Sequence, residues 1–130
     1  PKDQSFEVSF ADGYPYLLTT LASLNDLNQR LEVPIPMDRF RSNLVISGSE
    51  AFAEDGWRKI AVGEVEFQVV KPCARCQVTT IDQSSGIASK EPLKTLATYR
   101  KQDGKVMFGM NMVALSSGTI SINDPVKILS

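Results

Sequence analysis

Alternating hydrophobic and polar residues predict a chain built mainly from short strands. Phe6, Val8 and Phe10 alternate with polar side chains, so residues 4–10 are predicted to form a half-buried strand. Similar runs of apolar and β-branched residues, bounded by turn-forming residues, predict further strands. These lie at residues 16–19, 43–47, 60–62, 65–70, 77–81, 106–115, 119–122 and 126–129.

Short connections predict two of the strand pairings. A Gly-Glu turn separates residues 60–62 from residues 65–70, which favours a hairpin. Residues 119–122 are expected to pair in the same way with residues 126–129, across an Asn-Asp-Pro turn.

Glycine and proline predict where the chain turns or a strand ends. Residues 12–15, Asp-Gly-Tyr-Pro, form a predicted turn. Pro72 is expected to break the strand before it, and Gly109 is expected to interrupt the strand at 106–115. Residues 49–57 are acidic with two aromatic side chains, and either a helical turn or a loop fits them.

Two segments have a helical pattern. Leucines spaced by three and four predict an amphipathic helix over residues 20–31, ended by Pro34 and Pro36. The leucines are Leu21, Leu24, Leu27 and Leu31. Residues 90–100 suit a second helix, with Pro92 in its first turn. Strands outnumber helices, which favours a mainly β fold of the α+β type: a β-barrel or curled sheet flanked by two helices. No linker or repeat divides residues 1–130, so one domain is expected.

Composition narrows the possible functions. The 130 residues include no histidine, which excludes Ser-His-Asp triads, Cys-His proteases and imidazole metal sites. The net charge of −1 gives no bulk attraction for nucleic acid, so no DNA-binding surface is predicted. The apolar runs are too short for a membrane span, and the polar start shows no signal peptide, which favours a cytoplasmic location. Because the chain begins at Pro1, we expect a processed protein or a piece of a longer one.

The two cysteines, Cys73 and Cys76, allow four interpretations. Half of a zinc site would need two more ligands, and no other cysteine or histidine exists. A thioredoxin-like dithiol normally opens a helix, whereas a strand pattern follows Cys76. The pair could also be packed residues without chemistry. The fourth interpretation is a single thiolate that ligates a soft metal carried by a cofactor.

Neighbouring charges favour the fourth interpretation. Lys71 precedes the cysteines and Arg75 lies between them, and positive charge favours a thiolate. Arg39 and Arg41 lie shortly before a predicted strand with Asn43. Guanidinium groups bind phosphate with two hydrogen bonds, so this segment suits a planar or phosphorylated anion, although taken alone the arginines are better explained as exposed or ion-paired surface residues.

Taken together, the motifs of the chain resemble those of the MOSC domain, the molybdenum-cofactor sulfurase C-terminal family. The chain is most similar to the branch of the amidoxime-reducing components and their ferredoxin-linked bacterial relatives. The order and spacing of the matching segments make the resemblance specific. They are residues 12–15, 22–28, 39–45, 54–57, 73–76, 79–82, 90–96, 99–100, 108–109, 118–120 and 124–126. Ser42 and Met110 depart from the family pattern, which often has proline and glutamine there.

The resemblance implies specific roles for several residues. Cys76 matches the thiolate that ligates molybdenum and is the catalytic and metal-binding residue implied, with Cys73 as its non-ligand partner. Positions implied to contact the molybdenum cofactor, a molybdopterin, are Arg41, Asn43, Arg75, Asp12, Gly13 and Tyr14. Pyridoxal phosphate binding is implied only for the family in general. If the chain is a piece of a longer protein, the cofactor pocket is incomplete, and the isolated chain should be obtained inactive and without molybdenum.

The implied function is reduction of small N-hydroxylated substrates such as hydroxylamines, amidoximes and N-hydroxylated bases. Electrons would arrive from a partner of ferredoxin or cytochrome type. The cofactor would supply the reactivity, so the absence of histidine is no obstacle. The alternative is a domain that binds or carries the cofactor, or a cysteine-bound sulfur, without catalysis. A barrel with merely packed cysteines is a third possibility.

Overall fold

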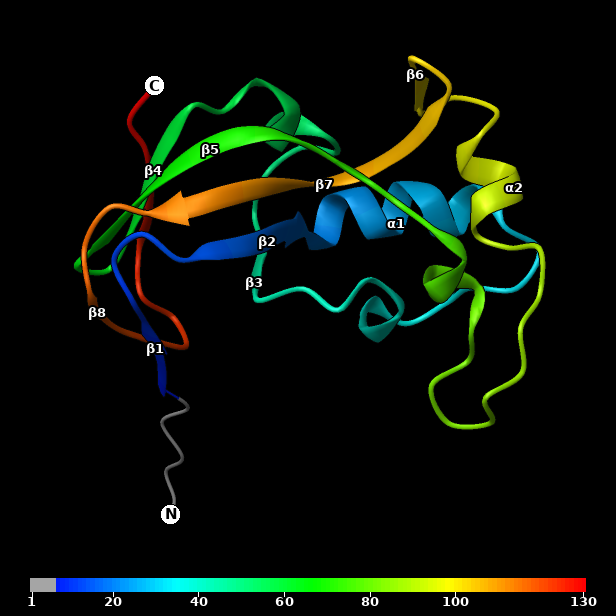
Figure 1. The fold of residues 1–130 in the computed structure, drawn as a ribbon, viewed down its shortest axis with the longest axis horizontal. Coiled ribbons are helices and arrows are strands. Elements are labelled where there is room, and N and C mark those ends of the chain that lie inside the picture. The colour runs from blue at the N-terminus through cyan, green and yellow to red at the C-terminus, as the bar shows by residue number, and fades with distance from the viewer. Residues whose placement is uncertain (1–6) are drawn as a thin grey trace.

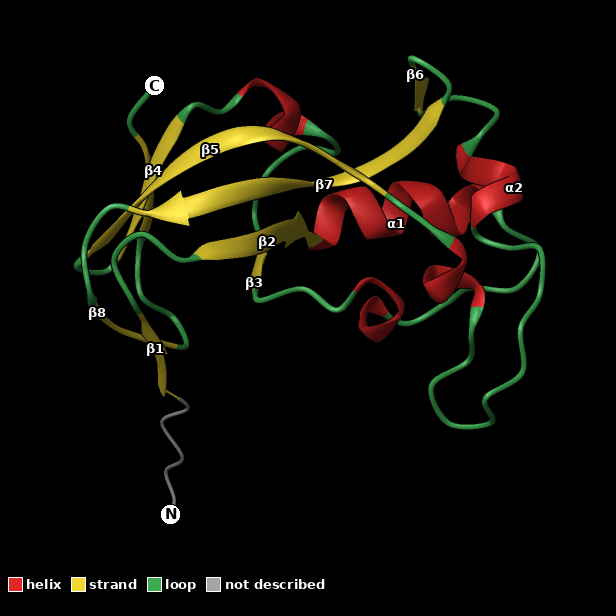
Figure 2. Cartoon of the chain, viewed as in Figure 1, coloured by secondary structure: helices red, strands yellow, loops and turns green. Residues whose placement is uncertain are grey.

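The computed structural model describes residues 7–130, apart from the side chains of residues 77 and 78. Two helices and three short 3₁₀ helices connect the strands (Figures 1 and 2). The strands are β1 (Glu7–Phe10), β2 (Pro15–Thr20), β3 (Leu44–Ile46), β4 (Lys59–Val62), β5 (Val65–Ala74), β6 (Lys101–Gln102), β7 (Lys105–Ala114), β8 (Gly118–Ser121) and β9 (Val126–Ile128). The helices are α1 (Leu21–Arg30) and α2 (Leu93–Leu96), and the 3₁₀ helices are η1 (Met37–Phe40), η2 (Ala53–Gly56) and η3 (Gln77–Thr80).

One curled sheet forms most of the molecule. Its strand order is β3-β2-β7-β5-β4-β9, and β6 pairs with the start of β7. β2 and β3 are parallel, while the other neighbours along this path are antiparallel. β1 and β8 form a separate two-stranded sheet. The helices lie at one end of the long strands β5 and β7 (Figure 1). The predicted fold class, a mainly β curled sheet with two helices, is confirmed.

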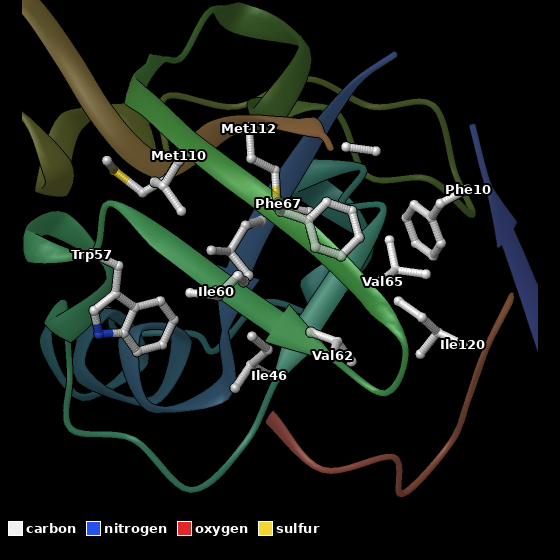
Figure 3. Packing of buried hydrophobic residues seen from close by; sticks show 13 residues of the cluster. Phe10, Ile46, Trp57, Ile60, Val62, Val65, Phe67, Met110, Met112 and Ile120 are labelled. Carbon is white, nitrogen blue, oxygen red and sulfur yellow. The ribbon is translucent and has the colours of Figure 1, made fainter. Parts of the chain in front are cut away.

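Two hydrophobic clusters hold this arrangement together. The larger one fills the curl of the sheet, where Phe67 is fully buried and lies edge-on to Phe10, with 5.1 Å between ring centroids (Figure 3). The smaller one joins α1, η1 and α2 to β7, and in it Phe40 stacks on Phe108 at 4.1 Å. Burial of one such aromatic side chain stabilises the fold by roughly 1.5–3 kcal/mol. The second cluster therefore anchors η1 firmly against the end of the sheet.

Helix α1 follows its sequence pattern closely. Thr20 is the N-cap, and its Oγ1 accepts a hydrogen bond from Ser23 N at 3.1 Å. Leu24 and Leu27 are buried as predicted, whereas Leu21, in the first turn, is 43% exposed. The helix ends before the prolines that were expected to stop it, at Arg30. Neither α1 nor any other helix within residues 7–130 is long and apolar enough to cross a membrane.

Tertiary pairing overrides two predicted strand breaks. β5 continues through Pro72 to Ala74, so the prediction that Pro72 breaks it is wrong. The register against β7 shifts on each side of Pro72, and such irregularities accommodate a residue without an N–H group. β7 likewise runs unbroken through Gly109, whose φ of +83° lets its backbone approach β2 closely. Paired neighbours thus keep both strands extended.

Three other local predictions differ from the structure. Residues 77–81 are not a strand, because Thr79 N and Oγ1 both bond to Cys76 O, at 3.2 and 2.9 Å, and close a 3₁₀ turn. β8 and β9 do not pair with each other; β8 pairs with β1, and β9 with β4. The helix predicted at 90–100 is only the four-residue α2, with Pro92 as its N-cap. The strand, hairpin and turn predictions elsewhere in the described residues are confirmed.

Glu54 is a buried acidic residue that fastens η2 to the start of α1. Ser23 Oγ donates a hydrogen bond to its carboxylate at 2.6 Å, and Thr20 Oγ1 donates another at 3.2 Å. Burial raises the pKa of Glu54, and the hydrogen bonds partly oppose that rise. The folded protein therefore binds this proton more tightly than the unfolded chain does.

Replacing Glu54 with glutamine should change how stability depends on pH. When a carboxyl group has a higher pKa in the folded protein than in the unfolded chain, the protein becomes less stable as the pH rises from the unfolded-state pKa through the folded-state pKa. Glu54→Gln stays neutral and keeps an acceptor for Ser23, so its free energy of unfolding should rise relative to wild type as the pH is raised from the ordinary pKa of a glutamate toward neutrality. Urea titrations across that range measure the difference, with Glu50→Gln at an exposed position as control. A difference that does not vary with pH would contradict the prediction.

Candidate functional site

The exposed thiol of Cys76 lies just beyond the end of β5, at the entry to η3. The carbonyl of Cys76 accepts both hydrogen bonds from Thr79, which fixes the backbone of this turn. Cys73, still within β5, is half-buried, and its Sγ accepts a hydrogen bond from Arg75 Nη1 at 3.1 Å. The two thiols therefore differ in environment, and Cys76 is the one that is open to a ligand.

Arg75 connects this turn to η1. Its Nη2 donates to the carbonyl of Phe40 at 2.9 Å, and its guanidinium lies 5.5 Å from the centroid of the Phe40 ring. Its own backbone N–H donates to Val106 O at 2.8 Å, which ties it to β7 as well. Arg75 Nε is buried and has no hydrogen-bond partner among the described residues. A cofactor contact from Arg75 stays a prediction, and Nε is one donor that could make it.

Arg39 and Arg41 come to the same place from η1. Arg39 Nη1 donates to Thr79 O at 3.3 Å, which joins η1 to η3 directly, and its Nε is buried without a partner among the described residues. Arg41 is exposed and follows η1 with a left-handed φ of +56°. The structure thus brings the segment with Arg39 and Arg41 next to the turn with Arg75 and Cys76, and a shared cofactor site there stays a prediction.

Positive charge dominates this corner of the molecule. Within residues 7–130, none of Arg39, Arg41 and Arg75 forms an ion pair. Asp82 interacts weakly with this group: its pKa is lowered mainly by the hydrogen bonds from Ser84 and to a smaller extent by Arg39. An excess of guanidinium groups with open donors suits an anionic ligand.

Asn43 is fastened to the neighbouring strand. Its Oδ1 accepts a hydrogen bond from Leu17 N at 2.7 Å, and its backbone N–H donates to Leu17 O at 3.0 Å. Next to it, Ser42 Oγ lies 2.6 Å from Thr19 Oγ1. In the part of the chain that the structure describes, nothing accepts a hydrogen bond from Asn43 Nδ2, which leaves that amide able to bind a ligand.

The turn that carries Asp12, Gly13 and Tyr14 lies at the other end of the sheet (Figure 1). Gly13 N donates to Ala114 O at 2.8 Å, at the end of β7. Cys76 lies at the opposite end of the sheet, where Ala74 of β5 pairs with Met107 near the start of β7. The structure therefore does not bring this turn to the cysteine, and its cofactor contact stays a prediction.

Two contributors were missed as site residues in the sequence. Arg39 was recognised only as part of a basic pair, yet it carries a buried donor without a partner. Thr79 was part of a predicted strand, yet it shapes the Cys76 turn and supplies the carbonyl that Arg39 bonds. The close spacing of the basic residues Arg39 and Arg41 could have indicated a role for Arg39. The role of Thr79 could not be predicted in this way, because it depends on the 3₁₀ turn.

The Arg75 clamp predicts a measurable loss of stability. In Arg75→Lys the single ammonium group cannot reproduce the fork that bonds Cys73 and Phe40 together. We expect the free energy of unfolding to fall by about 1–3 kcal/mol in urea titrations, because a buried carbonyl loses its partner.

Arg41→Lys is the matched control, since Arg41 is exposed and has no hydrogen bond from its side chain within residues 7–130. It should change stability by less than about 0.5 kcal/mol. Equal effects of the two substitutions would contradict the clamp.

Comparison with known proteins identifies a family for this chain. The model of the MOSC domain family matches residues 5–127. Mitochondrial amidoxime-reducing component 1 of Homo sapiens is 44% identical over 138 residues, a match that covers 99% of this chain and 40% of that protein. Mitochondrial amidoxime reducing component 2 of Homo sapiens is 39% identical over 133 residues, with 95% and 40% covered. The chain thus spans about 40% of the length of these relatives.

Two further similarities extend the comparison. Molybdenum cofactor sulfurase of Oryza sativa subsp. japonica is 41% identical over 120 residues, covering 84% of this chain and 15% of that protein. The crystal structure of YiiM from Geobacillus stearothermophilus superposes with a TM-score of 0.68 at 16% identity, covering 96% of this chain and 61% of that one. The structural match supports the fold alone.

Proposed function

The chain belongs to the MOSC domain family, and on that premise we propose that it binds a molybdenum cofactor within a reductase of N-hydroxylated compounds. Hydroxylamines, amidoximes and N-hydroxylated bases are the proposed substrate class, and a ferredoxin- or cytochrome-type protein is the proposed electron donor. One structural observation supports this most: an exposed thiol at Cys76 lies where arginines without ion pairs in residues 7–130 meet. The two human relatives called amidoxime-reducing components are 44% and 39% identical to the chain.

The residues present fit an anionic cofactor that carries its own metal. The buried Nε atoms of Arg39 and Arg75 are donors without acceptors in the described residues, as a site built for a missing anion would leave them. Residues 7–130 contain no group of three or more histidine, cysteine or acidic side chains that could hold a metal. Cys76 would therefore supply one ligand, and thiolates suit soft metal centres.

Each residue has a separate task in this proposal. When bound, the cofactor supplies metal-centred removal of oxygen from nitrogen. Cys76 donates thiolate charge to the metal, and the neighbouring guanidinium groups favour the deprotonated thiol. Arg39 and Arg41 bind anionic oxygens, while Arg75 holds the cysteine turn against η1. Asn43, two residues after Arg41 in the sequence, adds an uncharged donor at Nδ2.

An assay of the full-length protein tests the proposal. The protein is incubated with an aromatic amidoxime and a chemically reduced dye as electron donor, amidine formation is measured, and molybdenum is quantified in the same sample. We expect molybdenum in near-stoichiometric amount and turnover that depends on it. A protein that contains no molybdenum after expression with molybdate would overturn the proposal.

The similarity to a molybdenum cofactor sulfurase supports a second candidate function. In it the domain binds or carries the cofactor, or a sulfur on Cys76, without reducing a substrate. Bound molybdenum or a persulfide on Cys76, with no amidine formed from any donor, would favour this function.

The relatives named as amidoxime-reducing components are mitochondrial. A cytoplasmic location for this chain stays a prediction. Pyridoxal phosphate binding, implied for the family in general, and the lack of cofactor in the isolated chain stay predictions as well.

A further inference from the structure

A groove of about 680 Å³ lies between the two ends of the curled sheet. One wall is the whole of β3, and the other includes Val62 of β4 and Val126 of β9. Phe10 of β1 and Ile120 of β8 line it as well. Ile46, Val62 and Ile120 belong to the hydrophobic cluster inside the curl (Figure 3). The groove is therefore a gap in the barrel wall that reaches the core.

Both strands that border the gap have an open edge. Within residues 7–130, β3 pairs only with β2, and β9 pairs only with β4. Pro125 O accepts from Gly63 N at 3.0 Å and Leu129 N donates to Lys59 O at 2.8 Å, so alternate residues of β9 face β4. The peptide groups of Val126 and Ile128 then face away from β4, toward the gap side. Unpaired edges of this kind are sites where another strand can add.

The strand directions fix what could pair with both edges. β3 is parallel to β2, and the path from β2 through β7, β5 and β4 to β9 is antiparallel at each step. Four antiparallel steps restore the original direction, so β9 runs the same way as β3. One inserted strand that runs the opposite way would be antiparallel to both neighbours, which is the more stable ladder.

Exposed apolar side chains lie along the rim of the groove, next to polar ones such as Asn43, Ser47 and Asn123. Val8 is 50% exposed, Val45 41%, and Ile122 61%, and Val126 next to them is 37% exposed. An exposed apolar rim that continues into the core marks a contact surface rather than a solvated face. It fits an extended segment with apolar side chains at alternate positions. The lining residues include no cluster of acidic or basic side chains, so the lining does not indicate a charged ligand.

We propose that this gap is closed by a β-strand from outside residues 1–130 of the same polypeptide, paired antiparallel to β3 and β9. The amidoxime-reducing components are matched over only about 40% of their length, so proteins of this kind carry enough additional chain to supply the strand. The strand would complete the barrel and cover the apolar rim. The proposal rests on strand pairing and on the length of the relatives, and it is independent of the proposed reductase function.

Site-specific photo-crosslinking of the full-length protein tests the strand. A benzophenone amino acid is placed singly at Val45 or at Val126, one on each side of the gap. We expect both positions to link to one and the same peptide from outside residues 1–130. A mixture of isotope-labelled and unlabelled protein distinguishes links within one polypeptide from links between copies, and only the former are expected. The same probe at Val33, which is 74% exposed and does not line the groove, should not link to that peptide.

Hydrogen exchange of the unmodified full-length protein gives a second measurement that no substitution can disturb. The amides of Val126 and Ile128 should exchange slowly, as in a paired strand, although residues 7–130 offer them no partner. Links to a second copy, links from Val45 and Val126 to different peptides, or no links would each overturn the proposal. Fast exchange of both amides would overturn it independently.

Discussion

Cys76→Ala is expected to remove molybdenum from the full-length protein and to abolish reduction of the amidoxime, whereas Cys73→Ser should preserve both. Cys76 is exposed at the entry to η3, while Cys73 is half-buried within β5 and accepts a hydrogen bond from Arg75. Loss of an outer partner of a metal ligand costs roughly 10–100-fold in metal affinity, and loss of the ligand itself should cost more. Serine at position 73 keeps an acceptor for the Arg75 guanidinium, so the turn should keep its shape.

Metal analysis of the purified variants measures this effect, and thermal denaturation shows whether each variant remains folded. Folded Cys76→Ala protein with no molybdenum is the expected result. Wild-type molybdenum content and turnover in Cys76→Ala would exclude the thiolate ligand. Loss of metal in Cys73→Ser alone would instead assign the ligand to the other thiol. Each outcome thus identifies which cysteine, if either, contacts the metal.

The sequence correctly predicted the elements that depend only on neighbouring residues. Helix α1 needs only its leucine spacing and Thr20 as a cap, and the hairpin of β4 and β5 needs only a short turn between apolar runs. The resemblance implied roles for Cys76 and Arg41, and the structure shows that the η1 segment lies against the cysteine turn. The resemblance could not show that Arg75 bonds the carbonyl of Phe40, a contact across 35 positions of the chain.

Predictions failed where a distant segment decides the backbone. Pro72 stays within a strand because β7 pairs on both sides of it, with shifts in register. Residues 77–80 turn because Thr79 bonds back to Cys76, although their β-branched residues favoured a strand. The pairing of β8 with β1 closes a loop across more than a hundred residues, which no adjacent turn could reveal. Fold class survived these errors because it depends on the number and type of elements.

Gly109 illustrates the same principle in energetic terms, and Gly109→Ala is expected to destabilise the protein strongly. The residue adopts a φ of +83°, so a side chain there has a backbone cost of about 1–3 kcal/mol. An added Cβ would lie 2.9 Å from Leu18 O, closer than real Cβ contacts, and 3.0 Å from Thr19 Cγ2, tighter than most of them. Overpacking of this kind typically costs about 1–3 kcal/mol more. Because Leu18 lies in β2, the pairing of β2 with β7 must shift to relieve the contact.

Gly104→Ala separates the two contributions. Gly104 has a φ of +78°, close to that of Gly109, but an added Cβ would meet no atom within 4 Å. It should therefore show the backbone cost alone, and the difference between the two variants in urea titrations measures the contact with β2. We expect Gly109→Ala to be less stable than Gly104→Ala by about 1–3 kcal/mol. Equal stabilities would mean that β2 and β7 can move apart freely, and the close approach of these strands would then contribute nothing to the specificity of the fold.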